Sequence, residues 1–177
     1  MTVSLVIDTA TARTIVGVVR DGAVIWQSFH DGATDHGNAV ADLVKQALAA
    51  GVNPDRVVVG MGPGPFTGLR VGISFARAFA AARNIEVVGI CSLDAIIVDQ
   101  DEYTVAIDAR RKEIYWATYK SGNRIKGPAV NFPIDVDEYI IDRYPDITRI
   151  VELSAHTNYT EPFYLRRPDA VATADRT

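Results

Sequence analysis

The sequence predicts a two-lobed α/β fold in which the second lobe is shorter than the first. Two observations predict the two lobes. An apolar run that ends in aspartate occurs at Val3–Asp8 and again just before Asp108, and a turn glycine follows each run at the same distance, as Gly22 and Gly122. A third observation predicts the α/β class: a glycine-rich loop, 62–72, joins an apolar strand-like run to a helix-like run.

The first half predicts strands and helices in a regular order. Val3–Asp8 is typical of a buried strand, and Asp21-Gly22 is a strong hairpin signal between two β-rich runs, 14–20 and 23–29. Apolar residues recur at helical spacing over 36–50, where Asp35 is a candidate N-cap and Gly51 a stop signal. Further along, we expect strands at 57–60 and 86–90, a helix at 69–83 and a short helix near 92–98.

The pattern of the first half then restarts. Val105-Ala106-Ile107-Asp108 matches Leu5-Val6-Ile7-Asp8 at an offset of 100 positions, and the runs 15–20 and 114–120 also align. We interpret this as two related halves, a first lobe at 1–98 and a second at 99–177; a chance likeness of two hairpins is the alternative. The second half continues with a predicted helix at 136–143 and strand at 148–153. It lacks a counterpart of the glycine loop and its helix, and it ends in a polar tail expected to fray.

Two consecutive hairpins followed by alternating helices and strands, occurring twice, are typical of one architecture. We therefore predict the two-lobed ribonuclease-H-like fold of the actin, Hsp70 and sugar kinase superfamily, with a trimmed second lobe. A fold of this kind hosts many functions, so function has to be argued from particular residues.

Composition narrows the class of protein. With 48% hydrophobic residues the chain can form a proper core, and a net charge of −4 argues against a protein that grips nucleic acid alone. The single cysteine, Cys91, excludes an internal disulfide and suits a reducing compartment. No apolar run is long enough for a membrane span and no secretory leader opens the chain, so we expect a soluble, cytoplasmic protein.

The glycine loop does not match the phosphate-binding templates. Gly62 to Gly68 is one residue too long for a P-loop, and the gap between Gly64 and Gly68 is too long for a dinucleotide-binding loop. Pro63 and Pro65 each remove an amide donor. The motif residues Gly62, Gly64, Phe66, Thr67 and Gly68 are therefore interpreted as a rigid turn that orients the following helix.

A nucleotide site in this fold needs an acid followed by glycine and hydroxyl residues in each lobe. The first lobe offers Asp8 and Thr9 without a glycine, and the second offers Asp108, Arg110 and Arg111. These five residues are a weak candidate anion or nucleotide site, and a nucleotide-dependent kinase or ATPase with Mg²⁺ at the two aspartates remains the alternative function. No metal site is expected, because the fourth residue after His36 is Val40 and the other histidines lie far away.

The helix at 69–83 carries apolar residues on two faces. Val71, Phe75, Phe79 and Ala82 line one face, and a second face is formed by Leu69, Ile73, Ala76 and Ala80. A helix that covers a sheet needs only one apolar face, so the second face predicts a protein–protein interface.

Four segments together resemble a known family. They are Leu5 to Ala10, the loop 62–72, Asp108 to Tyr115, and Tyr164-Leu165-Arg166. The chain resembles the TsaB (YeaZ) family, whose members are non-catalytic partners of TsaD, the subunit that transfers a threonylcarbamoyl group to the adenosine beside the anticodon of tRNA. The catalytic relative carries two metal-binding histidines in H-x-x-x-H spacing, of which this chain has only His36.

The resemblance implies how the chain associates. Family members pair through the first two helices of the first lobe, either with a second copy when alone or with TsaD, and an ATPase, TsaE, joins the complex. The implied cofactors are none, with ATP or ADP only within the complex, and tRNA is reached indirectly. A direct tRNA contact through Arg110, Arg111, Lys112, Lys120, Arg124 and Lys126 is a weaker alternative. The expected partner-interface residues are His36, Val40, Leu43, Val44, Leu69, Arg70, Val71, Ile73, Phe75, Ala76, Arg77, Phe79 and Ala80.

Overall fold

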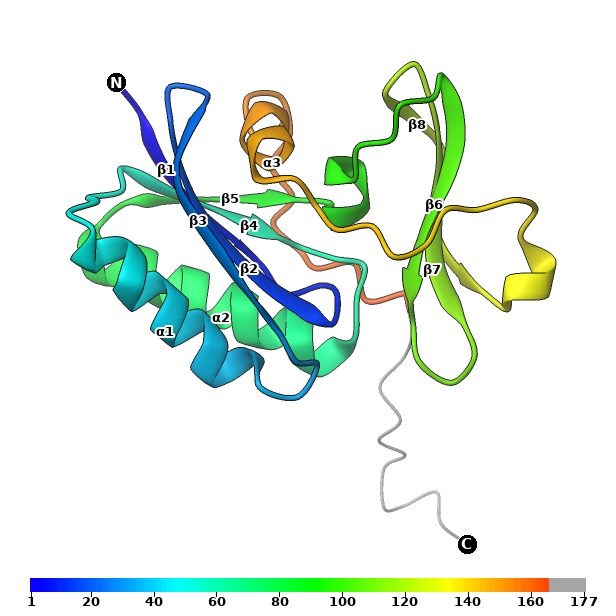
Figure 1. The fold of residues 1–177 in the computed structure, drawn as a ribbon, viewed down its shortest axis with the longest axis horizontal. Helices are drawn as coiled ribbons and strands as arrows, with labels where there is room; N and C mark the ends of the chain where they lie inside the picture. Colours follow the sequence, from blue (N-terminus) through cyan, green and yellow to red (C-terminus); the bar gives the residue numbers. More distant parts are fainter. Residues whose placement is uncertain (166–177) are drawn as a thin grey trace, which may run out of the picture.

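The computed structural model describes residues 1–165 and contains two sheets side by side (Figure 1). The larger sheet has the strand order β3-β2-β1-β4-β5. Its strands are β1 (Val3–Asp8), β2 (Arg13–Arg20), β3 (Ala23–Asp31), β4 (Arg56–Gly60) and β5 (Glu86–Ile90). The first three strands form an antiparallel meander, whereas β4 runs parallel to β1 and β5 parallel to β4. This mixed sheet confirms the predicted α/β class.

Helices cover both faces of the larger sheet (Figure 1). Helices α1 (His36–Ala49) and α2 (Phe66–Arg83) lie on one face, and α3 (Ile147–Leu153) lies on the other. Alternate residues of β1 serve the two faces: Leu5 and Ile7 pack in the core under α1 and α2, while Val6 packs with Ile147 and Ile150 of α3. Burial on both faces explains why Leu5, Val6 and Ile7 of β1 are apolar in succession instead of alternating with polar residues.

The smaller sheet repeats the first meander. Its strands β6 (Glu102–Asp108), β7 (Ile114–Lys120) and β8 (Asn123–Asn131) are antiparallel in sequence order. The hairpin turns match as well, because Asp21-Gly22 and Ser121-Gly122 all have positive φ, as a type I′ turn requires. Each first strand also ends in the same side-chain turn: Asp8 Oδ1 accepts from the Ala10 N–H and Asp108 Oδ1 from the Arg110 N–H, both at 2.9 Å. These matches support the interpretation of related halves.

A partly buried polar cluster centred on Arg124 joins the second sheet to the first lobe. The Arg124 guanidinium donates to Cys91 Sγ and to Tyr159 Oη, both at 3.1 Å, and lies 3.4 Å from the Asp94 carboxylate. Tyr119 Oη donates to the same carboxylate at 2.8 Å. Asp94 belongs to a short 3₁₀ helix, Ser92–Ala95, which is shorter than the helix expected near 92–98.

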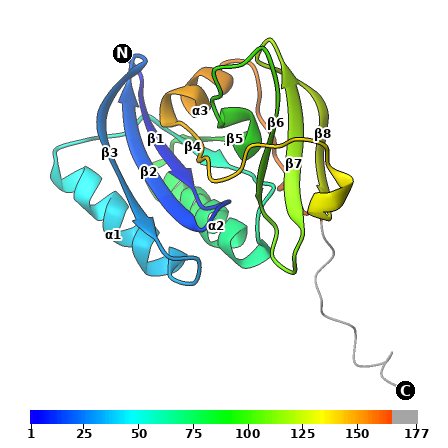
Figure 2. The same ribbon diagram turned by 45° about the vertical axis from the view of Figure 1, so that its right-hand side comes forward.

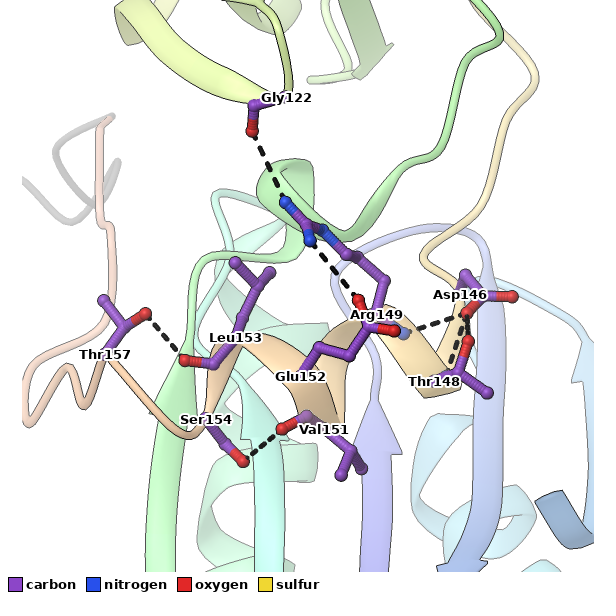
Figure 3. A network of polar contacts seen from close by, with 9 residues as sticks. All are labelled: Gly122, Asp146, Thr148, Arg149, Val151, Glu152, Leu153, Ser154 and Thr157. Carbon is purple, nitrogen blue, oxygen red and sulfur yellow. Dashed lines mark hydrogen bonds and ion pairs between the residues drawn. The ribbon is translucent and has the colours of Figure 1, made fainter. Parts of the chain in front are cut away.

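The strand predicted at 148–153 is wrong, because this segment is helix α3 (Figure 3). Asp146 caps the helix by accepting hydrogen bonds from the backbone N–H groups of Thr148 and Arg149 and from the Thr148 hydroxyl. At the other side Arg149 donates to the Gly122 carbonyl, at 3.4 Å, in the second hairpin. The β-branched residues favoured a strand, but the N-cap and the apolar spacing of Ile147 and Ile150 favour a helix.

The helix predicted at 136–143 is also wrong. A 3₁₀ turn at Pro133–Asp135 is followed by an extended segment, in which Ile140 forms a parallel bridge with Val105 of β6. The Ala106 N–H donates to the Ile140 carbonyl and the Ile140 N–H donates to the Thr104 carbonyl, both at 2.8 Å. This segment thus pairs with the free edge of β6. The backbone hydrogen bonds between the two outweigh the local helical pattern of the segment.

Helix α2 begins at Phe66 instead of 69, so that Phe66, Thr67 and Gly68 of the motif form its first turn. Arg166 of the Tyr164-Leu165-Arg166 motif and the predicted polar tail lie outside the described residues. Among residues 1–165, none of the helices has the length and apolar character needed to cross a membrane. The division into lobes at 98/99 stays a prediction.

Candidate functional site

The glycines of the loop 62–72 allow the start of α2 to lie directly on the β1–β2 turn. A Cβ added at Gly64 would come within 2.4 Å of the Ala10 carbonyl oxygen, and one at Gly68 within 2.8 Å of the Thr9 carbonyl oxygen. A Cβ at Gly72 would approach Thr9 Oγ1 to 2.2 Å. There is therefore no room for a side chain at these three glycines, and the loop holds the start of α2 against the β1–β2 turn.

Asp8 and Thr9, two of the weak anion-site candidates, are buried inside the first lobe. The Ser92 hydroxyl donates to Asp8 Oδ2 at 2.6 Å, and Thr9 Oγ1 donates to the Gly68 carbonyl at 2.8 Å. Burial raises the pKa of the Asp8 carboxyl above its ordinary value, although the bonds from Ser92 and Ala10 act in the opposite direction. Asp8 and Thr9 therefore form hydrogen bonds within the first lobe.

The expected interface residues divide into two groups. The first group packs in the core of the lobe, with side chains at most 6% exposed: His36, Val40, Leu43, Val44, Leu69, Ile73, Ala76 and Ala80. The second group remains at the surface of α2: Arg70, Val71, Phe75, Arg77 and Phe79. The interface stays a prediction. Only the second group and its exposed neighbours are accessible enough to contact a partner.

The outer side of α2 forms an apolar stripe, which we call the docking face. It consists of Val71, Phe75, Ala78, Phe79 and Ala82, spaced to lie along one side of the helix. The Phe75 and Phe79 rings stack with centroids 6.2 Å apart, and the Arg83 guanidinium lies 4.7 Å from the Phe79 centroid. Ala78 and Ala82 are exposed, and their small side chains would let a partner helix approach closely.

A segment after α3 packs beside α2 and the strands next to it. The Tyr159 N–H donates to the Gly89 carbonyl and the Phe163 N–H to the Met61 carbonyl. Arg77 Nη2 donates to the Thr160 carbonyl at 2.8 Å, and the Tyr164 ring lies 4.9 Å from the Phe66 ring. The sequence placed Tyr164 in a family motif without a role, and the structure places it beside the first turn of α2.

A second candidate site is a cleft lined by segments next to both sheets. Figure 2 shows these two sheets side by side, the larger on the left and the smaller on the right. The cleft has a volume of about 240 Å³. Its walls come from the β1–β2 turn, the start of α1, the end of β6 and the segment before α3. Of the five weak anion-site candidates, Asp108 and Arg110 line this cleft, while Arg111 lies in the same exposed hairpin tip.

The other charged groups named from the sequence do not gather at one site. Lys120 pairs with Glu102 at 2.8 Å, and Arg124 belongs to the partly buried cluster with Asp94. In the part of the chain that the structure describes, no three histidine, cysteine or acidic residues lie close enough to hold a metal ion.

Known proteins are similar to this chain in sequence and in fold. A family model described as "TsaD: tRNA N6-adenosine threonylcarbamoyltransferase" matches residues 30–171. An uncharacterized protein of Mycobacterium leprae is 47% identical over 77% of this chain and 41% of its own length. The tRNA threonylcarbamoyladenosine biosynthesis protein TsaB of Escherichia coli is 30% identical over 66% of this chain and 54% of its own length. The chain thus spans 41% and 54% of these two relatives.

A solved structure shares the fold. The crystal structure of an uncharacterized protein with similarity to peptidase YeaZ from Pseudomonas aeruginosa superposes with a TM-score of 0.79, covering 94% of this chain and all of the other. The two chains are 22% identical, so the likeness concerns the fold alone. It confirms the two-lobed architecture predicted from the sequence.

Proposed function

Since this chain belongs to the family of the matching TsaD model and is TsaB-like within it, we propose that it is a non-catalytic scaffold subunit of the tRNA threonylcarbamoyladenosine biosynthesis machinery, which acts in the cytoplasm and binds TsaD through α2. The single observation that carries the docking part is the stripe of Val71, Phe75 and Phe79 with exposed alanines beside it. The remaining contacts, with TsaE and indirectly with tRNA, belong to the same proposal.

The docking face has the chemistry of a helix-packing surface. Two stacked phenylalanines supply apolar area, the alanines leave room for a facing helix, and Arg70 and Arg77 flank the stripe and orient the partner. Without TsaD, the same face is open to a second copy of the chain. The isolated protein is therefore expected to form a symmetric dimer through α2.

A catalytic role is not part of the proposal. Asp8, which a kinase of this fold would use, is buried against Ser92, and the β1–β2 turn packs directly against the glycine loop. The Cys91 thiol is unsuited to nucleophilic catalysis, because burial raises its pKa to about 12.

The experiment compares two substitutions of alanine by arginine in α2. Ala78 is exposed, so Ala78→Arg places a long cation on the docking face of a folded chain, and we expect it to abolish co-purification with TsaD. Ala76 is fully buried, so Ala76→Arg would unfold the lobe instead, although the sequence also predicts Ala76 as an interface residue. Phe75→Asp, at a half-buried position, is the second interface variant.

The matched control is Ala155→Arg, an exposed alanine in the turn after α3. It should leave the complex with TsaD intact. Circular dichroism and thermal melting of each isolated variant check that the chain is folded. A folded Ala78→Arg chain that still binds TsaD at wild-type affinity would refute the proposed docking face.

A further inference from the structure

The cleft between the sheets carries chemistry that docking on α2 does not use. Its charged and polar lining residues are Thr11, His36, Asp108, Arg110, Asp142, Arg143 and Tyr144, and its apolar ones are Ala12, Ala33, Pro65, Ile107 and Ile141. They come from five separate segments, and the docking-face residues are not among them. The loops at the carboxyl ends of β1 and β6 form the cleft, a position where α/β proteins commonly bind small ligands.

His36 is a buried polar side chain that faces this cleft. It is 6% exposed, and its Nδ1 shares a hydrogen bond of 2.8 Å with Thr14 Oγ1. Its ring makes no other hydrogen bond among the described residues, yet none of their fully buried side-chain nitrogen or oxygen atoms lacks a partner. Nε2 therefore reaches the cleft, where it can meet a ligand. His36 is also the first residue of α1, whose first turn has no side-chain cap and no acidic residue.

The charges in the cleft are balanced. Arg110 and Arg143 supply two cations, and Asp108 and Asp142 supply two carboxylates. Arg143 forms no ion pair with any described residue, so its charge is available to a ligand. Burial and the Arg110 charge both lower the pKa of His36, which keeps the imidazole neutral at neutral pH.

From these groups we infer that the cleft binds a small zwitterion, namely a free α-amino acid. The two arginines and the uncapped start of α1, with His36 Nε2, face the carboxylate, and Asp108 and Asp142 face the ammonium group. Ile107 and Ile141 give an apolar wall for the side chain. A volume of about 240 Å³ suits a ligand of this size.

A phosphate-rich ligand fits this cleft less well. Its several negative charges would meet Asp108 and Asp142 as well as the arginines, and the glycine loop contributes only Pro65, which has no N–H to donate. A simple anion would be complementary only to the arginines, and a simple amine only to the aspartates. An α-amino acid carries both charged groups on one carbon atom and is complementary to both.

Calorimetric titration of the full chain tests this inference. The twenty standard L-amino acids are titrated one at a time, with acetate, methylamine and inorganic phosphate as probes of one charge only. We expect at least one apolar amino acid to bind and the three other probes to bind at least about tenfold more weakly. Arg143→Gln and Asp142→Asn should each weaken amino-acid binding by about tenfold or more.

Matched controls remove the same charges elsewhere. Arg20→Gln at the first hairpin and Asp99→Asn before β6 are exposed and lie outside the cleft, so binding should be unchanged. The inference is overturned if no amino acid binds, if phosphate binds more tightly than every amino acid, or if the cleft variants bind like wild type. Because the varied residues Asp142 and Arg143 are not part of the docking face, these outcomes can be distinguished from those of the co-purification test.

Discussion

Gly72 in α2 and Thr9 in the β1–β2 turn are so close that a Cβ on the glycine would lie 2.2 Å from the threonine hydroxyl oxygen. The two residues are 63 positions apart in the chain. Their contact brings the docking helix against the turn that follows the central strand. The docking face is therefore held by the most buried part of the first lobe.

Gly72→Ala should destabilise the protein by about 2 kcal/mol or more, because the added methyl group meets a buried hydroxyl that cannot move away. Urea unfolding monitored by circular dichroism measures the effect. Gly37 in α1 is the control, since a Cβ there has nothing within 4 Å. Gly37→Ala should stabilise by up to about 1 kcal/mol through helix propensity, and equal effects at the two sites would contradict the close contact.

Asp8→Asn should change how stability depends on pH. Burial raises the folded-state pKa of Asp8 above its unfolded value, so the wild-type chain loses stability as pH rises from that unfolded value through the folded pKa. Asparagine does not titrate and can still bond to Ser92 and Ala10. The stability of Asp8→Asn relative to wild type should therefore increase from about pH 4 to pH 7, as measured by urea unfolding at each pH. If the difference in stability between variant and wild type stays constant or falls with pH, burial does not raise the pKa of Asp8.

Arg124→Met should weaken the attachment of the second sheet. The substitution keeps most of the side-chain volume but leaves the Asp94 carboxylate, only 16% exposed, without its cation. Loss of one partner from such a pair costs about 3 kcal/mol. Lys120→Met serves as control, because the Lys120–Glu102 pair is more than half exposed and its loss should have no measurable effect. Similar unfolding midpoints for the two variants would argue against the Arg124 cluster as the link.

The Cys91 thiol should not react in the native protein. It is fully buried, its pKa is raised to about 12 by burial, and Arg124 donates to its sulfur. A colorimetric thiol titration at pH 8 should detect none in the native chain and one per chain in guanidinium chloride. Rapid reaction of the native protein would show that the Cys91 environment opens readily.

Local patterns predicted much of the fold. The apolar run of β1, the Asp21-Gly22 turn and the spacing of α1 each carry a strong signal over a few neighbouring residues. The segment after β8 was mispredicted because its structure depends on distant partners: Ile140 extends along the free edge of β6, and α3 forms where Asp146 caps it against the first sheet. Asp146 was a usable N-cap signal that the β-branched residues after it outweighed.

For the candidate sites too, local patterns could be predicted from the sequence, whereas contacts between distant segments could not. The spacing of Val71, Phe75 and Phe79 exposed the two-faced character of α2, but only the packing reveals that Leu69, Ile73 and Ala76 face inward. The cleft had no signal in the sequence as a whole, because His36, Asp108 and Arg143 come from segments far apart in the chain. Of the five residues that the sequence suggested for an anion site, only Asp108 and Arg110 line the cleft, and their neighbours there depend on how the two sheets pack.

The position of α3 has a consequence for how the chain folds during synthesis. Helices α1 and α2 emerge with the first sheet and cover one of its faces, but the face formed by Val6, Val58 and Val88 stays bare until residues 147–153 have left the ribosome. Nearly the whole described chain must be made before this sheet is sealed. A nascent chain stalled soon after β5 would therefore present an apolar sheet surface, and would be a natural client for chaperones.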